Sequence, residues 1–312
     1  MDPVTHTLVG VGIANAFFRK RIGKAAVPIL ALASNLPDID GAVMLTGDPT
    51  AVLMRRTFGH SLFLLPIWIL ALSFIFRRYY PHLRWGTLIG LTSIGALVHL
   101  FFDLVNSFGV VLFWPFSDWR PELGIIFIID LILTGLLAAP LFLSRIPSMR
   151  ESLVPLSRGA VALVAVYVLL CVFSRTQAEQ LLEEGSTQPA DFSYVFPEPL
   201  GPHRWRGVWR EGNLYRVYLL HLFSGEKEER DQVTTEIGDP RVEKARAAPL
   251  AHRIEWFFKA PVWQIDEEVE ERSMDAPADV SVYDLRFRTL VVEYSVPFVY
   301  RFRVDDEARA AD

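Results

Sequence analysis

Long apolar runs, separated by short polar turns, occupy most of the first 173 residues of the chain. A helix needs about 20 mostly apolar residues to cross the roughly 30 Å hydrocarbon core of a membrane, and these runs approach that length. An earlier run at residues 7–18 is shorter, so we expect a partial, re-entrant or tilted helix there. A buried soluble bundle is the alternative, and the succession of runs disfavours it. The long runs are residues 25–45, 61–76, 85–105, 123–143 and 159–173.

The composition changes after residue 173. The whole 312-residue chain is 51% hydrophobic, but residues 174–312 are rich in charge and alternate between apolar and polar positions. We therefore predict an α-helical multi-pass membrane domain with five or six helical segments, followed by a small β-rich soluble domain. The membrane domain is expected at residues 1–173, a helical linker at 174–190 and the β-rich domain at 191–312.

The soluble half contains alternating patterns typical of strands. Residues 203–223 form two such runs around a Glu-Gly-Asn turn, which predicts a hairpin. The polar stretch 224–249 is expected to be a flexible insertion or to contain a helix near residues 239–248. Its histidines show no ligand spacing and are interpreted as structural. Further strands are predicted within residues 253–265, 280–294 and 298–304, and the histidines are His203, His221 and His252.

Composition also excludes several classes. The net charge of −5 gives no electrostatic basis for binding nucleic acid. The single cysteine, Cys171, excludes a disulfide framework and a cysteine-based zinc site. The first ten residues carry an acid and no basic cluster, which argues against a cleaved secretory signal. No Ser-His-Asp arrangement or phosphate-binding loop stands out.

Basic residues predict the orientation in the membrane. Ten lie in the turns around residues 19–24, 77–84 and 145–158, whereas the opposite turns hold only Arg55, Arg56 and Arg120. By the positive-inside rule the first set is cytoplasmic. The second set and the whole C-terminal half then face outward.

Polar residues within the apolar half gather on this outer side. Ionisable groups inside a membrane are costly, so a functional site is their default interpretation. His99 and Asp103 are four residues apart and share one helical face, and Asp2 and His6 have the same spacing. The residues on the outer side are Asp2, His6, Asp38, Asp40, His60, His99, Asp103 and Asn106.

Pro37 favours a break or turn that points Asp38 and Asp40 into one cavity. This mixture of imidazoles and carboxylates suits zinc, manganese or iron, and one or two ions could be held. A metal-bound water would supply a hydroxide at neutral pH.

Simpler roles remain open for each residue. A lone His99 could be satisfied by a backbone carbonyl or water, and Asp38 and Asp40 could cap a helix. Asp130 could join the site, bond Thr134 or face a neighbouring helix.

Five short motifs occur in one order over residues 1–143: MDPVTHTLVG, NLPDID, RRTFGHS, HLFFDLVNSFGVVLFWPFS and IIFIID. In these motifs the chain resembles the YdjM-type membrane-bound metal-dependent hydrolases. The resemblance implies a multi-pass protein of the bacterial inner membrane with a distant link to zinc phospholipase C-like enzymes. Many members have a histidine where this chain has Arg55, so one ligand is lost here if that histidine binds metal. The implied ligands are His6, Asp38, Asp40, His60, His99 and Asp103.

Together these features predict a metal-dependent hydrolase that acts on a phosphoester or lipid-like substrate at the outer face. Asp38 and Arg55 are the expected catalytic residues, with Arg55 or Arg56 holding an anionic head group. The expected cofactor is a divalent metal, zinc or alternatively manganese, and the expected partners include membrane lipids.

The alternative function is a non-catalytic membrane scaffold or stress-response partner with a structural polar or metal cluster. In that case the C-terminal domain would bind another protein. A transporter is a weaker option, because the apolar segments show no obvious internal repeat.

Overall fold

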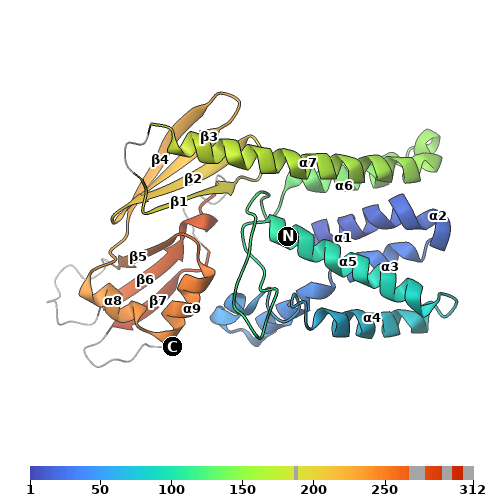
Figure 1. The fold of residues 1–312 in the computed structure, drawn as a ribbon, viewed down its shortest axis with the longest axis horizontal. Coiled ribbons are helices and arrows are strands. Elements are labelled where there is room, and N and C mark those ends of the chain that lie inside the picture. The colour runs from blue at the N-terminus through green and yellow to red at the C-terminus, as the bar shows by residue number, and fades with distance from the viewer. Residues whose placement is uncertain (186–188, 267–277, 290–296, 305–312) are drawn as a thin grey trace. The chain divides into compact units, whose positions relative to one another are not determined.

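The structure is a computed structural model that describes residues 1–185, 189–266, 278–289 and 297–304. It divides into two compact units, which we describe separately (Figure 1). The helical unit comprises Met1–Arg175 and Pro199–Pro202. The sheet unit comprises Thr176–Glu198 and His203–Asp312. The division follows Arg175, and helix α7 (Leu153–Glu183) continues without interruption through the residues expected to begin a separate linker.

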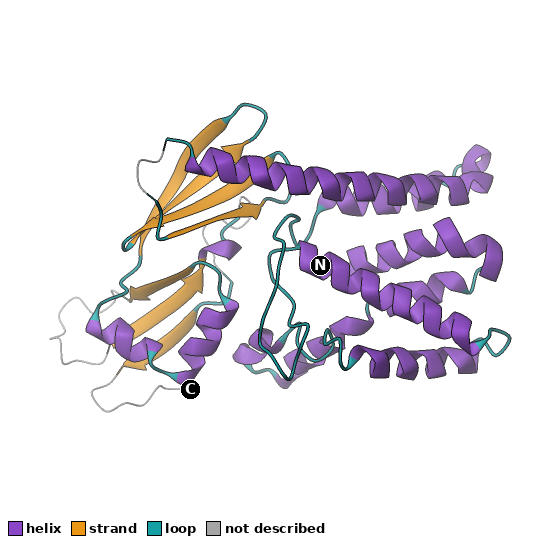
Figure 2. Cartoon of the chain, in the orientation of Figure 1, coloured by secondary structure: helices purple, strands orange, loops and turns teal. Residues whose placement is uncertain are grey.

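The helical unit is built from α-helices joined by several tighter 3₁₀ segments and one π-helical turn (Figure 2). Its α-helices are α1 (Pro3–Ile13), α2 (Arg19–Ile22), α3 (Ala26–Ala33), α4 (Leu65–Tyr79), α5 (Trp85–Val105), α6 (Leu131–Leu143) and the first part of α7. The π-helical turn is Ala14–Phe18, and the 3₁₀ segments are Leu36–Thr46, Pro49–Met54 and Pro147–Ser152.

Among the described residues, two helices are long and apolar enough to cross a membrane: α5 and the continuous helix Pro147–Glu183 that contains α7. A third crossing is counted if α3 and the 3₁₀ segment Leu36–Thr46 form one span bent by 50°. The expected five or six crossings are therefore not confirmed. The predicted run 61–76 becomes α4, which starts only at Leu65 with Pro66 in its first turn.

The predicted run 123–143 is also interrupted, because its first residues hydrogen-bond to the end of another helix, α5. The amides of Leu123 and Ile125 donate to the carbonyls of Leu104 and Val105 at 2.7 and 2.8 Å. Those carbonyls lie at the C-terminal end of α5, where a helix leaves acceptors without intrahelical partners. Helix α6 consequently begins at Leu131.

The break between α3 and the segment Leu36–Thr46 positions the later site. Pro37 lies in the first turn of that segment, and the Asp38 amide donates to the Asn35 carbonyl at 3.2 Å rather than to Ser34. The Ser34 carbonyl is thereby left for another donor. The predicted helix break at Pro37 is present, and it frees a backbone acceptor inside the unit.

Two glycines permit close packing against this break. A Cβ on Gly95 of α5 would lie 2.6 Å from the Cβ of Ala33 and 2.9 Å from the Ser34 amide nitrogen. A Cβ on Gly59 would collide with the Pro37 carbonyl. The segments that carry His60 and His99 can therefore approach the backbone that carries Asp38.

The sheet unit contains two antiparallel sheets. The first has the order β1 (Phe192–Pro197), β2 (Arg204–Glu211), β3 (Leu214–His221), β4 (Glu226–Thr234). The second has the order β5 (Pro261–Ile265), β6 (Ala278–Asp284), β7 (Tyr300–Val304), and it is accompanied by α8 (Pro240–Arg246) and α9 (Pro249–Phe257). Val208, Val217, Val262 and Leu285 share one buried core, so the unit has a hydrophobic centre of its own.

The predicted hairpin is present as β2 and β3, paired from Arg204 with His221 to Glu211 with Leu214. Within the stretch 224–249, residues Glu226–Thr234 form strand β4 rather than an insertion, whereas α8 agrees with the helix expected near 239–248. The strand expected over 253–265 is wrong in its first part, because α9 runs to Phe257 with Ala251, Ile254 and Phe257 buried along one helical face. The strand expected over 280–294 ends at Asp284 with β6, and Leu285–Phe287 form a 3₁₀ turn instead. Residues 290–294 lie outside the described residues.

Candidate metal centre

Four side chains of the helical unit converge on one point: Asp38, His60, His99 and Asp103. Each offers one ligand atom, and these atoms all lie within 4.8 Å of one another. Asp38 comes from the 3₁₀ segment Leu36–Thr46, His60 from the turn before α4, and His99 and Asp103 from one face of α5. The last three are fully buried, and the Asp38 side chain is 14% exposed.

Hydrogen bonds orient both imidazole rings. His60 Nδ1 lies 2.8 Å from Asp40 Oδ2, and His99 Nδ1 lies 2.7 Å from the Ser34 carbonyl oxygen. Both partners are acceptors, so each Nδ1 must be the protonated donor. In the neutral rings, each Nε2 therefore carries a lone pair. This is the arrangement in which protein histidines bind metals, with one nitrogen fixed by an acceptor and the other left for the ion.

The two free nitrogens face each other. His60 Nε2 and His99 Nε2 are 3.1 Å apart, and they lie 3.2 and 3.6 Å from Asp103 Oδ2. Two lone pairs and a carboxylate oxygen at this separation repel one another unless a proton or a metal cation lies among them. Asp38 Oδ2 is buried and has no hydrogen-bond partner among the described residues. A donor set of two imidazoles and two carboxylates fits zinc or manganese.

His6 and Asp40 each contact a member of this group. The His6 ring stacks on His99 with centroids 3.7 Å apart, and its Nε2 lies 3.2 Å from Asp103 Oδ1. Asp40 is fully buried, and its Oδ2 accepts the hydrogen bond from His60 Nδ1. Its Oδ1 has no hydrogen-bond partner among the described residues. The structure places both beside the four converging residues, and their role as direct metal ligands stays a prediction.

The two neighbouring arginines lie in different surroundings. Arg55 is partly exposed and its Nη2 donates to Asp38 Oδ1 at 2.9 Å. Arg56 is buried, and its Nε lies 2.8 Å from Asp103 Oδ2 while its Nη1 donates to Asn106 Oδ1 at 2.8 Å. Of the two arginines expected to hold a head group, only Arg55 is partly open to solvent.

Sequence reasoning missed two parts of this arrangement. The Ser34 carbonyl carries no side-chain signature, and only the break at Pro37 hinted that a backbone acceptor would be available. The burial of Arg56 was also not predicted, because Arg55 and Arg56 were given the same expected role as contacts for an anionic head group.

Asp2 and Asp130, whose membership was left open, are used elsewhere. Asp2 caps α1 by accepting from the amides of Val4 and Thr5, each at 3.0 Å. Asp130 caps α6 through the Leu133 amide at 2.8 Å and accepts the Tyr167 hydroxyl at 2.6 Å. Both carboxylates therefore stabilise helix ends.

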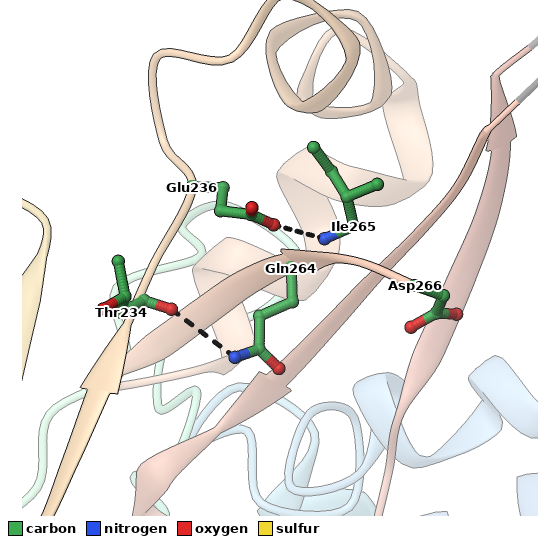
Figure 3. Close-up of a pocket in the computed structure, with 5 residues that line it drawn as sticks. All are labelled: Thr234, Glu236, Gln264, Ile265 and Asp266. Atoms are coloured by element: carbon green, nitrogen blue, oxygen red, sulfur yellow. Dashed lines mark hydrogen bonds between the residues drawn. The ribbon is translucent and has the colours of Figure 1, made fainter. Parts of the chain in front are cut away.

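The sheet unit has a polar pocket of about 410 Å³ (Figure 3). Its polar groups already hold the edge of β5: Glu236 accepts the Ile265 amide, and Gln264 Nε2 donates to the Thr234 carbonyl at 3.5 Å. Asp266 accepts from Ser281 Oγ at 2.9 Å. We interpret these contacts as protection of an edge strand rather than as a second site.

Charged groups in the sheet unit are also structural. Burial lowers the pKa of Arg206, which pairs with the buried Glu198. The hydrogen bond from the Arg241 side chain lowers the pKa of Asp239, which caps α8. His203 stacks on Phe223 with centroids 5.1 Å apart, and desolvation by burial lowers its pKa.

Comparison with known proteins identifies the family. The family model of the YdjM inner membrane protein matches residues 1–181, which is more than half of the chain and contains all four converging residues. The chain belongs to the YdjM family. It is also 29% identical over 133 residues to the uncharacterized protein YfhP of Bacillus subtilis strain 168. That match covers 40% of this chain and 41% of YfhP, and no solved structure gives a significant match.

Proposed function

We propose that this YdjM-family protein is a membrane-embedded, metal-dependent hydrolase that acts on a phosphoester in a lipid-like substrate at the outer face. The observation that carries the proposal is the pair of opposed imidazole nitrogens beside Asp103 Oδ2 and the unpartnered Asp38 Oδ2. Burying lone-pair atoms this close together in a membrane protein costs free energy unless a positive charge lies between them.

Asp38, His60, His99 and Asp103 would hold the metal, for which zinc and then manganese are the best candidates. When bound, a divalent ion supplies a Lewis acid and lowers the pKa of its water to about 7. Asp40 and the Ser34 carbonyl keep the two imidazoles oriented through their Nδ1 atoms. This orientation leaves Nε2 of each ring directed at the metal position.

Asp38 and Arg55 form the accessible side of the centre. Their side chains are 14% and 38% exposed, whereas His60, His99 and Asp103 are fully buried. An anionic head group at Arg55 would draw its guanidinium away from Asp38 Oδ1. The freed Asp38 Oδ1 could then accept a proton of the attacking water as the water oxygen bonds to phosphorus. The P–O bond to the leaving group would break in the same step, and the proton held by Asp38 would pass to the leaving oxygen.

A patch of exposed aromatic rings supports a lipid-like substrate. Phe63 contacts Phe116 with centroids 5.0 Å apart, and Phe113 stacks on Trp119 at 5.9 Å. All four rings are exposed. Aromatic side chains favour the membrane–water interface.

This aromatic patch is tied to the residues of the site through the backbone. The Val111 amide donates to the Arg56 carbonyl at 2.9 Å, and Ser61 Oγ donates to the Trp114 carbonyl at 2.6 Å. The segment that carries Arg56 and His60 therefore continues directly into the patch. A substrate whose tail lies in the interface could present its head group near this segment.

The test begins with metal content. Elemental mass spectrometry of the detergent-purified protein should find bound zinc or manganese in the wild type and little in His99→Ala or Asp103→Asn. His203→Ala, in the sheet unit, is the matched control and should retain the metal. The wild type should also hydrolyse lipid phosphoesters, and the two metal-site variants should not. Wild-type protein without metal under several metal supplements would refute the proposal.

One observation favours a second function, a scaffold with a structural metal. Three of the four converging residues are fully buried, and structural zinc sites are closed whereas catalytic sites keep a water position. Water-proton relaxation of the manganese-loaded protein separates the two functions. Rapid exchange of a bound water supports the hydrolase, and its absence supports the scaffold.

A further inference from the structure

The two oxygens of Asp103 have different surroundings. Oδ2 faces the free nitrogens of His60 and His99, and it also lies 2.8 Å from Arg56 Nε in an ion pair. Oδ1 accepts from Arg56 Nη2 at 3.1 Å and Asn106 Nδ2 at 3.3 Å, and it lies 3.2 Å from His6 Nε2. The Met1 amino group also contacts Oδ1. Protein donors therefore surround Oδ1, and only Oδ2 is directed at the imidazole pair.

Arg56 is held in this position from several sides. Its Nη1 donates to Asn106 Oδ1 at 2.8 Å, and its guanidinium lies 5.2 Å from the centre of the Phe108 ring. Its backbone has φ of 62°, a left-handed conformation that is uncommon for residues other than glycine. Such conformations persist only where the surroundings impose them, and they concentrate at functional sites.

We propose that Arg56 takes the place that a second metal ion would occupy on Asp103, so that the centre holds a single divalent cation. In two-metal hydrolases the ions lie about 3.5–4 Å apart and act together on the substrate. A carboxylate that bridges two ions must give one oxygen to each. Here the guanidinium contacts both oxygens of Asp103, and it leaves a metal only the oxygen that faces the histidines.

Charge supports the same limit. Asp38, Asp40 and Asp103 are opposed by Arg55 and Arg56, so the protein leaves at most one negative charge for a metal to balance. A single divalent ion already exceeds that charge. A second one would enter a buried site with a net positive charge, where unbalanced charge is strongly unfavourable. The inference rests on the proposed metal centre and adds its stoichiometry.

The experiment counts ions in the full-length protein after equilibrium dialysis against zinc, by elemental mass spectrometry. Wild type should hold one equivalent. Arg56→Gln should take up two at saturating zinc, because the guanidinium that contacts both oxygens of Asp103 is removed. Within the described part of the chain, a second ion then competes at Oδ1 only with the Met1 amino group, Asn106 and His6. Arg56→Lys keeps a positive charge there and should hold one. Arg158→Gln, in the same unit, is the control and should also hold one, since the Arg158 side chain donates to the Ala16 carbonyl rather than to a carboxylate of the centre.

Two equivalents in the wild type, or one in a folded Arg56→Gln, would overturn the inference and leave the hydrolase proposal standing. No metal in the wild type would overturn both. If Arg56→Gln cannot be purified, electron paramagnetic resonance of the manganese-loaded wild type provides the decision. A spectrum of isolated Mn²⁺ ions supports the inference, and a spectrum of coupled pairs contradicts it.

Discussion

Buried carboxylates are used differently in the two units. In the sheet unit, Asp284 is fully buried and accepts from the amides of Lys259, Ala260 and Arg286 at 2.8, 3.0 and 2.8 Å. It also pairs with the Arg286 guanidinium at 3.1 Å. Both of its oxygens are thus engaged, by Lys259 and Ala260 between α9 and β5 and by Arg286 in the turn after β6. This is how a buried charge is accommodated when its role is structural.

In the helical unit, polar atoms near the opposed histidines behave differently. Within the part of the chain that the structure describes, Asp38 Oδ2, Asp40 Oδ1 and His6 Nδ1 are buried without a hydrogen-bond partner. All three belong to the residues around the opposed histidines. The contrast with Asp284 favours a ligand-binding role for this cluster over a purely structural one.

The largest expected effect is on metal affinity, and it should distinguish a metal ligand, His60, from the residue that orients it, Asp40. His60→Ala removes one of the facing nitrogens and should abolish stoichiometric metal binding. Asp40→Asn keeps an acceptor near His60 Nδ1 but removes its charge, and loss of such an orienting partner typically costs 10–100-fold in metal affinity. Isothermal titration with zinc measures both variants. An Asp40→Asn variant as defective as His60→Ala would instead make Asp40 a direct ligand.

The next effect should appear in the sheet unit alone. Asp284→Ala leaves Arg286 without its buried partner, and breaking a buried ion pair costs about 3–5 kcal/mol. Chemical unfolding followed by tryptophan fluorescence should show this loss, while metal content stays at the wild-type value. Asp279→Ala, at an exposed position on the neighbouring strand β6, is the control and should change little. Metal loss in Asp284→Ala would contradict the separation of the two roles.

A smaller effect should link packing to metal affinity. Gly95→Ala places a Cβ against Ala33 and Ser34, and such overpacking costs about 1–3 kcal/mol. Because the Ser34 carbonyl orients His99, zinc affinity should fall as well. Gly90→Ala on the same helix meets nothing within 4 Å and is the matched control. Thermal unfolding in detergent and zinc titration check the pair, and equal behaviour of the two variants would contradict the packing argument.

The grouping of site residues was largely predictable, because polar side chains within apolar runs are rare and their spacing is informative. His60, His99, Asp38 and Asp103 do converge. The partners at the other ring nitrogens depend on tertiary contacts. Asp40 could be named from the sequence, but its bond to His60 Nδ1 could not, and nothing in the sequence marks the Ser34 carbonyl.

The helices themselves were less predictable than the site. Hydropathy shows that residues 123–130 are apolar, but it does not show that their amides would satisfy the end of α5. Likewise, residues 253–257 alternate enough to resemble a strand, yet Pro249 starts a helix whose buried face includes Ile254 and Phe257. For residues 123–130, hydrogen bonds to the distant end of α5 determine the structure. For residues 253–257, burial of one helical face determines it. Local composition alone does not distinguish these structures from the expected ones.

The smallest predicted effect concerns a carboxylate that is neither buried nor part of the metal centre. Asp239 caps α8 by accepting from the Arg241 amide at 2.9 Å, and the hydrogen bond from the Arg241 side chain lowers its pKa. Asp239→Ala should reduce the free energy of unfolding of the sheet unit by about 1 kcal/mol at neutral pH. Because the folded-state pKa is lowered, this stabilisation is complete above the unfolded pKa of about 3.9 and is lost as pH falls through the folded value.

Asp239→Asn retains the cap without the titrating charge, so its stability should depend less on pH between about 5 and the acid limit than that of the wild type. Unfolding in urea at several pH values measures the difference. Identical pH dependence in the two proteins would show that the charge of Asp239 has no part in stability. Metal content should be unchanged in both Asp239 variants, because Asp239 stabilises α8 and its side chain hydrogen-bonds to Arg241 rather than to the four converging residues of the metal centre.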